Sequence, residues 1–145
     1  DSTISVVDAA SNVVTTTITA VQSRPYALAY LANSASSRLL VANNNSASVS
    51  VLDGTSYAAI ATTLVGAHPT AIGIVDANKA YVLNHFDGNF AVINPTTGAV
   101  IGGAVTLPAG AVSLAVAPDS SFASITAYPN SLARINTTIN AVTVQ

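Results

Sequence analysis

Two residues that could do acid–base or metal chemistry stand two apart in the stretch YVLNHFDGNFAVIN, residues 81–94. An imidazole beside a carboxylate, as in His85 and Asp87, could act as a general base with its orienting acid. The same two side chains could also supply half of a metal site. Asp-Gly is a strong hairpin-turn dipeptide, however, so Asp87-Gly88 fits an ordinary turn equally well.

A second histidine and an arginine precede prolines at matching points of the chain. His68 precedes Pro69, and Arg24 precedes Pro25. The backbone before a proline is pushed toward extended conformations. A cation or polar group at both points could bind an anionic ligand, and the alternative is an exposed loop residue. The candidate ligand-contacting residues are therefore Arg24, His68, His85 and Asp87.

Stronger chemical signatures do not occur in the sequence. Two His and no Cys are too few for a zinc site. Runs such as NNNS and DAN offer oxygen ligands, but they lack the dense acidic cluster of a calcium loop. Serine is abundant, yet no Gly-x-Ser-x-Gly elbow is present. We therefore predict no catalytic residue, no metal and no cofactor.

The composition argues against two classes of partner. Half of the 145 residues are hydrophobic and only 7% are charged, with a net charge of −2. Because the four basic residues are scattered along the chain, we expect no binding to nucleic acid. No apolar run reaches the roughly 20 residues that a spanning helix needs, so we expect no membrane span.

The balance of polar residues bears on localisation. Glu is absent and Lys nearly so, while Ser, Thr and Asn are abundant. This balance is more typical of an extracellular or cell-surface protein than of a cytosolic enzyme. Two glycosylation sequons, at Asn44 and Asn136, agree with that localisation. We therefore expect an extracellular or cell-surface protein with Asn44 and Asn136 as possible glycosylation sites.

The chain repeats itself about every 42 residues. VANNNSASVSVLD (41–53) aligns without a gap on VLNHFDGNFAVIN (82–94). An apolar stretch that ends in Asp or Asn recurs at four markers, spaced by 45, 41 and 42 residues: Asp8, Asp53, Asn94 and Asn136. Such side chains accept hydrogen bonds from backbone N–H groups two residues on, so we expect the markers to be structural turn residues.

Each repeat contains four short strands separated by turn residues. Four strands in about 42 residues are what a β-propeller blade requires, so we predict an all-β protein of four-stranded antiparallel blades. We label the strands a to d from the inside of a blade outward. Strand a begins near a proline, b is the Val-Ala-Asn strand, c ends at a marker, and d is rich in Thr and Val. The expected a strands are 25–31, 69–75 and 110–117, and the expected b strands are 37–43, 79–84 and 121–127.

Counted in order, the strands predict an incomplete ring. A c–d pair comes first and three a–b–c–d units follow, which makes 14 strands or about three and a half blades. Closed propellers have four to eight blades. We expect one domain over 1–145, with blade-like repeats at approximately 1–24, 25–66, 67–107 and 108–145. The d strand of the third of these units is expected within AVIGGAVTL, residues 99–107.

The pattern also resembles a known repeat family. Residues 39–79 read LLVANNNSASVSVLDGTSYAAIATTLVGAHPTAIGIVDANK. This resembles the YVTN-type β-propeller repeat, which runs roughly as YVAN, a polar turn, VSVID, a turn and strand, G-x-x-P, a strand and SPDG. The resemblance covers essentially the whole chain, although FASITAYPNSLARIN (122–136) lacks the Asn and APDSS replaces the Pro-Asp-Gly turn.

The resemblance implies the fold and says little about function. Some propellers of this type resemble lactonases and electron-transfer enzymes, but the haem-binding Cys-x-x-Cys-His is absent here. In a blade the b–c and d–a turns emerge on one face, near the channel mouth, so the four candidate residues are expected to share that face. His85 aligns with Asn44 and Asp87 with Ser46. Because the equivalent turn lacks both residues, we favour a turn over a catalytic dyad.

Both ends of such a chain are expected to be open. The first c–d pair lacks its own a and b strands and exposes a strand edge. The last blade is expected to leave an apolar face uncovered. The remaining blades of a longer chain could fill these places, or self-association could build a ring or a filament.

These expectations lead to two functional hypotheses. The first is a non-catalytic extracellular structural or interaction module, possibly a self-assembling surface or filament subunit or an excerpt of a larger propeller. The alternative is a ligand-binding or hydrolytic, lactonase-like propeller whose site lies on the face of His68 and His85.

Overall fold

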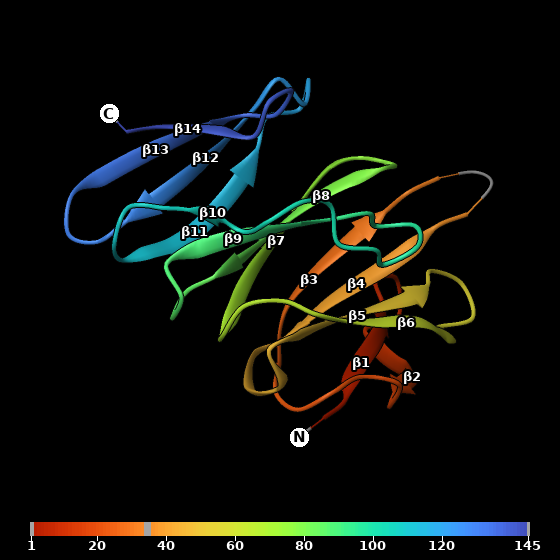
Figure 1. Ribbon diagram of the computed structural model, residues 1–145. Coiled ribbons are helices and arrows are strands. Elements are labelled where there is room, and N and C mark those ends of the chain that lie inside the picture. Colours follow the sequence, from red (N-terminus) through yellow and green to blue (C-terminus); the bar gives the residue numbers. More distant parts are fainter. Residues whose placement is uncertain (1, 34–35, 145) are drawn as a thin grey trace.

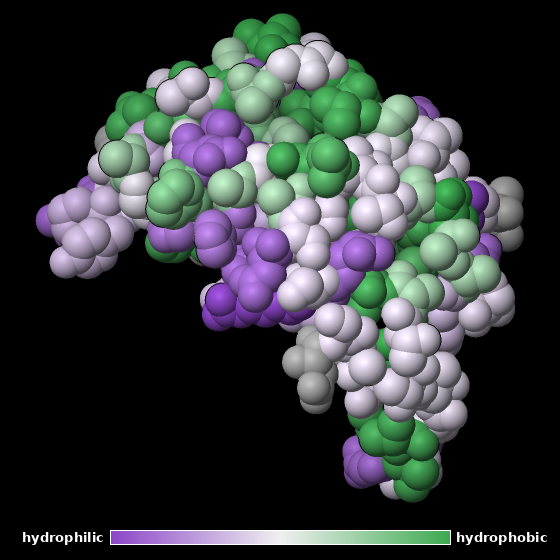
Figure 2. Space-filling view, turned by 60° about the horizontal axis from the view of Figure 1, so that its bottom comes forward, coloured by the Kyte–Doolittle hydropathy of each residue, from purple (hydrophilic) through white to green (hydrophobic). Residues whose placement is uncertain are grey.

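The computed structural model describes residues 2–33 and 36–144. These residues form one two-stranded and three four-stranded antiparallel sheets, in which neighbouring strands in sequence are neighbours in space. Figure 1 shows the sheets following one another along an open arc, with the two termini at opposite ends. In Figure 2 the arch is seen in space-filling form, with hydrophilic residues gathered along the inside of the bend.

The strands group into a half-blade and three blades. The half-blade holds β1 (Ile4–Asp8) and β2 (Val13–Ile18). The first blade holds β3 (Pro25–Leu31), β4 (Arg38–Asn43), β5 (Ser48–Asp53) and β6 (Ala59–Leu64), with the short 3-10 helix η1 (Asn44–Ser46) between β4 and β5. The second blade holds β7 (Pro69–Asp76), β8 (Lys79–Asn84), β9 (Asn89–Ile93) and β10 (Val105–Thr106). The third blade holds β11 (Ala111–Val116), β12 (Phe122–Ala127), β13 (Ser131–Asn136) and β14 (Ala141–Val144).

This arrangement confirms the predicted all-β fold and its order of strands, a c–d pair followed by three a–b–c–d units. The d strand of the second blade is shorter than expected. Val100 forms only an isolated bridge with Ile93, and β10 begins at Val105. Gly102 and Gly103 lie between these two stretches. Glycine offers a strand no side chain to pack and loses much entropy on ordering, which explains the break.

The hydrophobic core lies between the blades. The b and c strands of the first and second blades are the most buried, because both faces of these two sheets contact a neighbouring sheet. Between the first and second blades, Leu40, Val49 and Val51 pack against Val82 and Ile93. Burying each such side chain fully contributes about 1.5–3 kcal/mol. These contacts hold successive blades face to face.

The second and third blades share a similar interface with larger side chains. Tyr81, Leu83 and Phe90 are fully buried there against Ile125 and Ile135. The rings of Tyr81 and Phe90 meet edge to face at 4.9 Å between centroids. A smaller cluster joins the half-blade to the first blade.

Cations clamp each blade to the next at the outer ends of the b strands. Arg38, which begins β4, donates from Nε to the Thr96 carbonyl in the second blade, at 3.2 Å. Lys79, which begins β8, donates from Nζ to the Thr137 carbonyl in the third blade, at 2.6 Å. Phe122 begins β12 at the equivalent position of the third blade. The two cations therefore serve as structural contacts between blades.

The outer face of the third blade is mixed and mostly polar, which differs from the expected uncovered apolar face. Ser124, Thr126 and Arg134 point outward, and the apolar Phe122 and Leu132 lie among them, with Leu132 paired with Thr126 across β12 and β13. The matching positions of the second blade hold Tyr81, Leu83 and Val92.

The opposite end of the arc is apolar. Tyr26, Leu28 and Tyr30 alternate along β3 and are 57%, 52% and 54% exposed. Beside them β1 pairs only with β2. Within residues 2–33 and 36–144, no helix is long and apolar enough to cross a membrane.

Candidate functional site

The d–a and b–c turns meet on one face in every blade. In the first blade the backbone N–H of Asn44 donates to the carbonyl of Arg24, at 2.8 Å. In the second, His85 donates in the same way to His68, at 3.1 Å. In the third, Tyr128 donates to Gly110, at 2.8 Å. The four candidate residues therefore lie on the same face, at the start of the innermost strands.

His85 ties its own blade to the next one. Its Nδ1 lies 2.7 Å from the backbone carbonyl of Ala111, the first residue of β11. Because a carbonyl only accepts, Nδ1 carries the proton, which in the neutral ring leaves Nε2 as an acceptor. Asn44 makes the equivalent contact one blade earlier, since its Nδ2 donates to the carbonyl of Pro69 at 3.2 Å. An asparagine thus fills the same structural position.

Asp87 is bound to the backbone rather than to His85. Its Oδ2 accepts from the N–H of Ala67, at 2.8 Å. Ser46 does the same in the first blade, where its Oγ accepts from the N–H of Ser23 at 3.0 Å. No hydrogen bond joins His85 to Asp87 in the described structure. The two residues lie in one turn, but each makes a hydrogen bond that joins this turn to the backbone of a neighbouring segment.

His68 sits between two loops. Its Nδ1 lies 3.1 Å from Oδ1 of Asn44, and its ring lies 5.7 Å from the exposed ring of Phe86. Because Asn44 donates through Nδ2, its Oδ1 is the acceptor here and His68 Nδ1 is the donor. The imidazole therefore adds one more link between the first and second blades.

Arg24 and His68 have left-handed backbones, with φ of 56° and 52°. Gly110 takes the equivalent place in the third blade, with φ of 79°. The left-handed region costs a residue with a side chain about 1–2 kcal/mol. The sequence offered no sign of this, because the pre-proline position indicates extended backbone. Arg24 also lies 5.8 Å from the ring centre of Tyr26.

A small pocket opens where the three inner strands begin. The register of each a strand shifts at its second residue, after Pro25, Pro69 and Ala111. The residues at these three bulges are Tyr26, Thr70 and Val112, and with His85 they line a pocket of about 140 Å³. The buried hydroxyl of Thr70 has no hydrogen-bond partner among the described residues. Sequence reasoning missed Tyr26, Thr70 and Val112, although their position after the first residue of strand a could have identified them.

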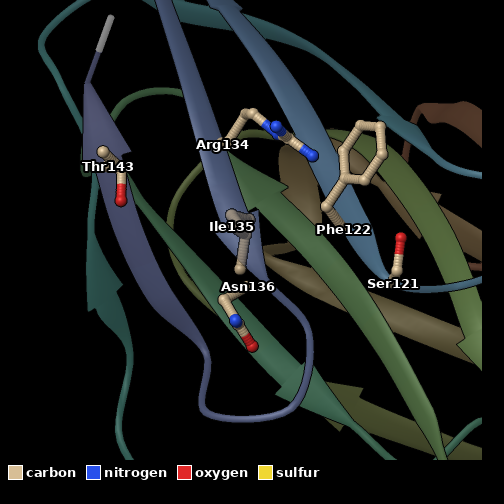
Figure 3. Close-up of a pocket in the computed structure, with 6 residues that line it drawn as sticks. All are labelled: Ser121, Phe122, Arg134, Ile135, Asn136 and Thr143. Atoms are coloured by element: carbon tan, nitrogen blue, oxygen red, sulfur yellow. The ribbon is translucent and has the colours of Figure 1, made fainter.

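A second hollow, of about 370 Å³, lies on the outer face of the third blade. Figure 3 shows its six lining residues, with the guanidinium of Arg134 beside the ring of Phe122. The guanidinium carbon lies 3.8 Å from the ring centre, a cation–π contact. Ser121, Asn136 and Thr143 complete the polar part of the wall. The sequence reasoning did not single out this hollow.

The four repeat markers all close the c–d turn through one side-chain oxygen. Oδ1 of Asp53 accepts from the N–H groups of Thr55 and Ser56, at 3.0 and 2.8 Å. Asp8, Asn94 and Asn136 accept in the same pattern. These bonds favour the carboxylate, so they hold the pKa of Asp8 and Asp53 below the usual value. The markers therefore stabilise the c–d turns in which they lie.

The two sequons differ in access. Asn44 is 5% exposed and its Nδ2 is already bonded to Pro69, so the folded chain does not present that amide to solvent. Asn136 is exposed. As for metals, no three acidic or histidine side chains gather within the described ranges into a group that could hold an ion.

Comparisons with solved structures identify the architecture. The chain matches the dihydro-heme d1 dehydrogenase NirN in complex with DHE with a TM-score of 0.76 and 12% identity, over 96% of this chain and 32% of that one. It matches a functionally unknown protein from Desulfotomaculum acetoxidans with a TM-score of 0.78 and 14% identity, over 99% of this chain and 47% of that one. The described chain is an open piece of a β-propeller.

A third similar structure is Kuenenia stuttgartiensis hydrazine synthase, with a TM-score of 0.74 and 17% identity, over 82% of this chain and 34% of that one. The chain thus spans about a third to a half of the length of these proteins. Identities this low establish the fold alone. No family model matches the sequence, and no curated protein matches it.

Proposed function

We propose that this chain is a non-catalytic structural or interaction module of the YVTN-type β-propeller class, acting outside the cell or on its surface. The YVTN-like pattern of residues 39–79, the low charge and the exposed sequon at Asn136 support the class and the localisation. Its partners would be further blades of a longer polypeptide or other copies of the chain, and not nucleic acid.

The observation that carries this proposal is the equivalence of two turns. His85 and Asp87 make the contacts that Asn44 and Ser46 make one blade earlier. An amide and a hydroxyl without an activating partner have no acid–base function, so the contacts themselves require only hydrogen-bonding capacity. The most reactive side chains of the chain are therefore engaged in holding turns to neighbouring strands.

The double substitution His85→Asn with Asp87→Ser tests this role, because it gives the second blade the residues of the first. Hydrolysis of a panel of lactones and chromogenic esters would be measured for the wild type and the variant. We expect no turnover above buffer in either protein and a nearly unchanged urea midpoint. Turnover by the wild type that disappears in a folded variant would overturn the proposal.

One observation favours the alternative, a ligand-binding or hydrolytic propeller. The pocket at the bulges brings the unpartnered hydroxyl of Thr70 together with His85, whose Nε2 remains an acceptor. Such a pocket could hold a small molecule with both a donor and an acceptor. If the double variant loses saturable binding of a small ligand while staying folded, the alternative is the better description.

A further inference from the structure

The apolar stripe on the first blade lies where a preceding blade would contact it. Leu28 pairs with Val41 in the same register as Ile72 with Val82 in the second blade. Tyr30 is equivalent to Ile74 by the same register. Ile72 and Ile74 pack into the core between the first and second blades. Leu28 and Tyr30 hold the matching positions, yet they are more than half exposed.

A strand edge lies open beside this stripe. In each full blade the c strand pairs with b on one side and d on the other, as β5 does with β4 and β6. Strand β1 is the c strand of the half-blade and pairs with β2 alone in the described structure. Its other edge therefore presents backbone N–H and C=O groups without strand partners.

We propose that this end of the arc is a docking site for a β-hairpin supplied by polypeptide outside residues 1–145. The hairpin adds strands a and b to the edge of β1 and covers Leu28 and Tyr30. This inference rests on the proposed structural role and names its partner. Addition of strands to an open edge is an established mode of peptide recognition.

A second copy of the chain does not fit this site. Each a–b hairpin of the chain is already paired with its own c strand. The blade face that a copy could offer is the outer face of the third blade, where Ser124, Thr126 and Arg134 lie beside Phe122 and Leu132. Placing the three polar side chains against Leu28 and Tyr30 would bury unpaired polar groups, which costs free energy.

The neighbouring interface defines the residues that the hairpin must carry. Strand a needs Gly or Ala in its middle: a Cβ on Gly73 would lie 2.7 Å from Leu114 and Val116, and Ala29 is the equivalent residue in the first blade. Strand b needs large apolar residues that face the first blade. In the same way Leu40 faces the second blade and Tyr81 faces the third.

Charge adds a further requirement. Arg38 and Lys79 each begin strand b and donate to the c–d turn of the following blade. The c–d turn of the first blade, residues 53–58, begins with the acidic Asp53. We therefore expect a Lys or Arg at the first position of strand b in the docking hairpin, where it lies beside Asp53.

The chain contains a probe of the required chemistry. Residues 67–88 hold the a–b hairpin of the second blade and its b–c turn, with Gly73, Lys79 and Tyr81 at the three positions described. In the repeat, Asn89 is equivalent to Thr3, because both lie five residues before a marker, Asn94 and Asp8. A copy of 67–88 placed directly before Thr3 therefore continues into β1 in register.

The experiment compares this grafted chain with the ungrafted one by thermal unfolding and by oxidative footprinting of tyrosines. We expect the graft to raise Tm by about 2–4 °C, the shift that ~1 kcal/mol gives in a chain of this size. Oxidation of Tyr30 should fall at least threefold. The matched control carries Ser and Thr in the graft in place of Tyr81 and Leu83, as the third blade does at Ser124 and Thr126, and should show neither effect.

Three results would overturn the proposal. The first is a graft that unfolds the chain or leaves Tm and oxidation unchanged. The second is a control graft that acts as well as the apolar one. The third is an ungrafted chain that already shields Tyr30 as it dimerises, which would assign the surface to a second copy. Lactone or ester turnover by the wild type would count against the proposed function without altering these readouts.

Discussion

Oδ2 of Asp87 accepts a hydrogen bond from the backbone N–H of Ala67 at 2.8 Å. Ser46 accepts from Ser23 at the same point of the first blade. The bond ties the b–c turn of a blade to the segment that enters it. It explains why an acid can stand in this turn without a catalytic partner.

This contact predicts the ranking of two variants at position 87. Asp87→Ser keeps an acceptor of the kind used at Ser46 and should change the free energy of unfolding by less than about 0.5 kcal/mol. Asp87→Ala removes the acceptor and should cost about 0.5–1.5 kcal/mol. Urea unfolding curves measure both. Equal stability of the Ser and Ala variants would show that the tie contributes nothing.

A second prediction concerns Gly110, which combines a φ of 79° with crowding. A Cβ there would lie 2.6 Å from the carbonyl oxygen of Tyr128. Gly110→Ala should therefore lower the free energy of unfolding by more than about 1 kcal/mol. The control is Gly103→Ala, because a Cβ at Gly103 meets nothing within 4 Å. If both substitutions have the same effect on the urea midpoint, the left-handed turn is not the cause.

The clamp between the second and third blades gives a third prediction. Lys79→Met keeps the aliphatic stem but loses the bond from Nζ to the Thr137 carbonyl. Because the bond is part-buried, we expect a loss of about 1.5 kcal/mol, the low end for a charged donor. Lys79→Arg should retain most of the stability. Equal unfolding midpoints for Lys79→Met and Lys79→Arg would show that this hydrogen bond does not stabilise the contact between the two blades.

The markers predict a loss of stability in acid. Bonds from Ser11 and Ser56 hold the pKa of the markers Asp8 and Asp53 below the usual 3.8, and bonds from Ser121 do the same for Asp119 in the turn between β11 and β12. A folded-state pKa below the unfolded one means that the unfolded chain binds more protons, so the stabilisation is full above about pH 4 and is lost as pH falls through the folded pKa. The urea midpoint should therefore fall as the pH is lowered below about 4.

The matched variants for this prediction are Asp8→Asn and Asp53→Asn, since Asn94 and Asn136 already close the same turn as amides. Both variants should fold at neutral pH and show a shallower loss of stability in acid. A pH profile identical to that of the wild type would mean that other groups cause the acid limb.

The blade order was readable from sequence because the signals were local and repeated. Prolines near the a strands, the Asn residues that end β4 and β8, and the markers recur at nearly constant spacing. The alignment of Asp87 with Ser46 also anticipated a structural turn. Periodicity of this kind fixes which strand follows which, since each blade is one repeat of the same unit.

Three features could not be read in the same way. The left-handed backbone of Arg24 and His68 depends on the bond from the following b–c turn, which no local pattern encodes. The break before β10 depends on how much two glycines weaken an outer strand. The sequence shows Ser124 and Arg134 as polar residues in strands, but only the register shows that these residues point away from the second blade.

The open edge of the half-blade is the central feature of this fold, and hydrogen exchange of backbone amides in the unmodified chain tests it directly. Strands β5 and β9 have partners on both sides, whereas β1 has one. We predict that alternate amides of β1, those facing the free edge, exchange far faster than the amides of β5 and β9 at every protein concentration. Uniform protection along β1, equal to that of β5, would contradict the account.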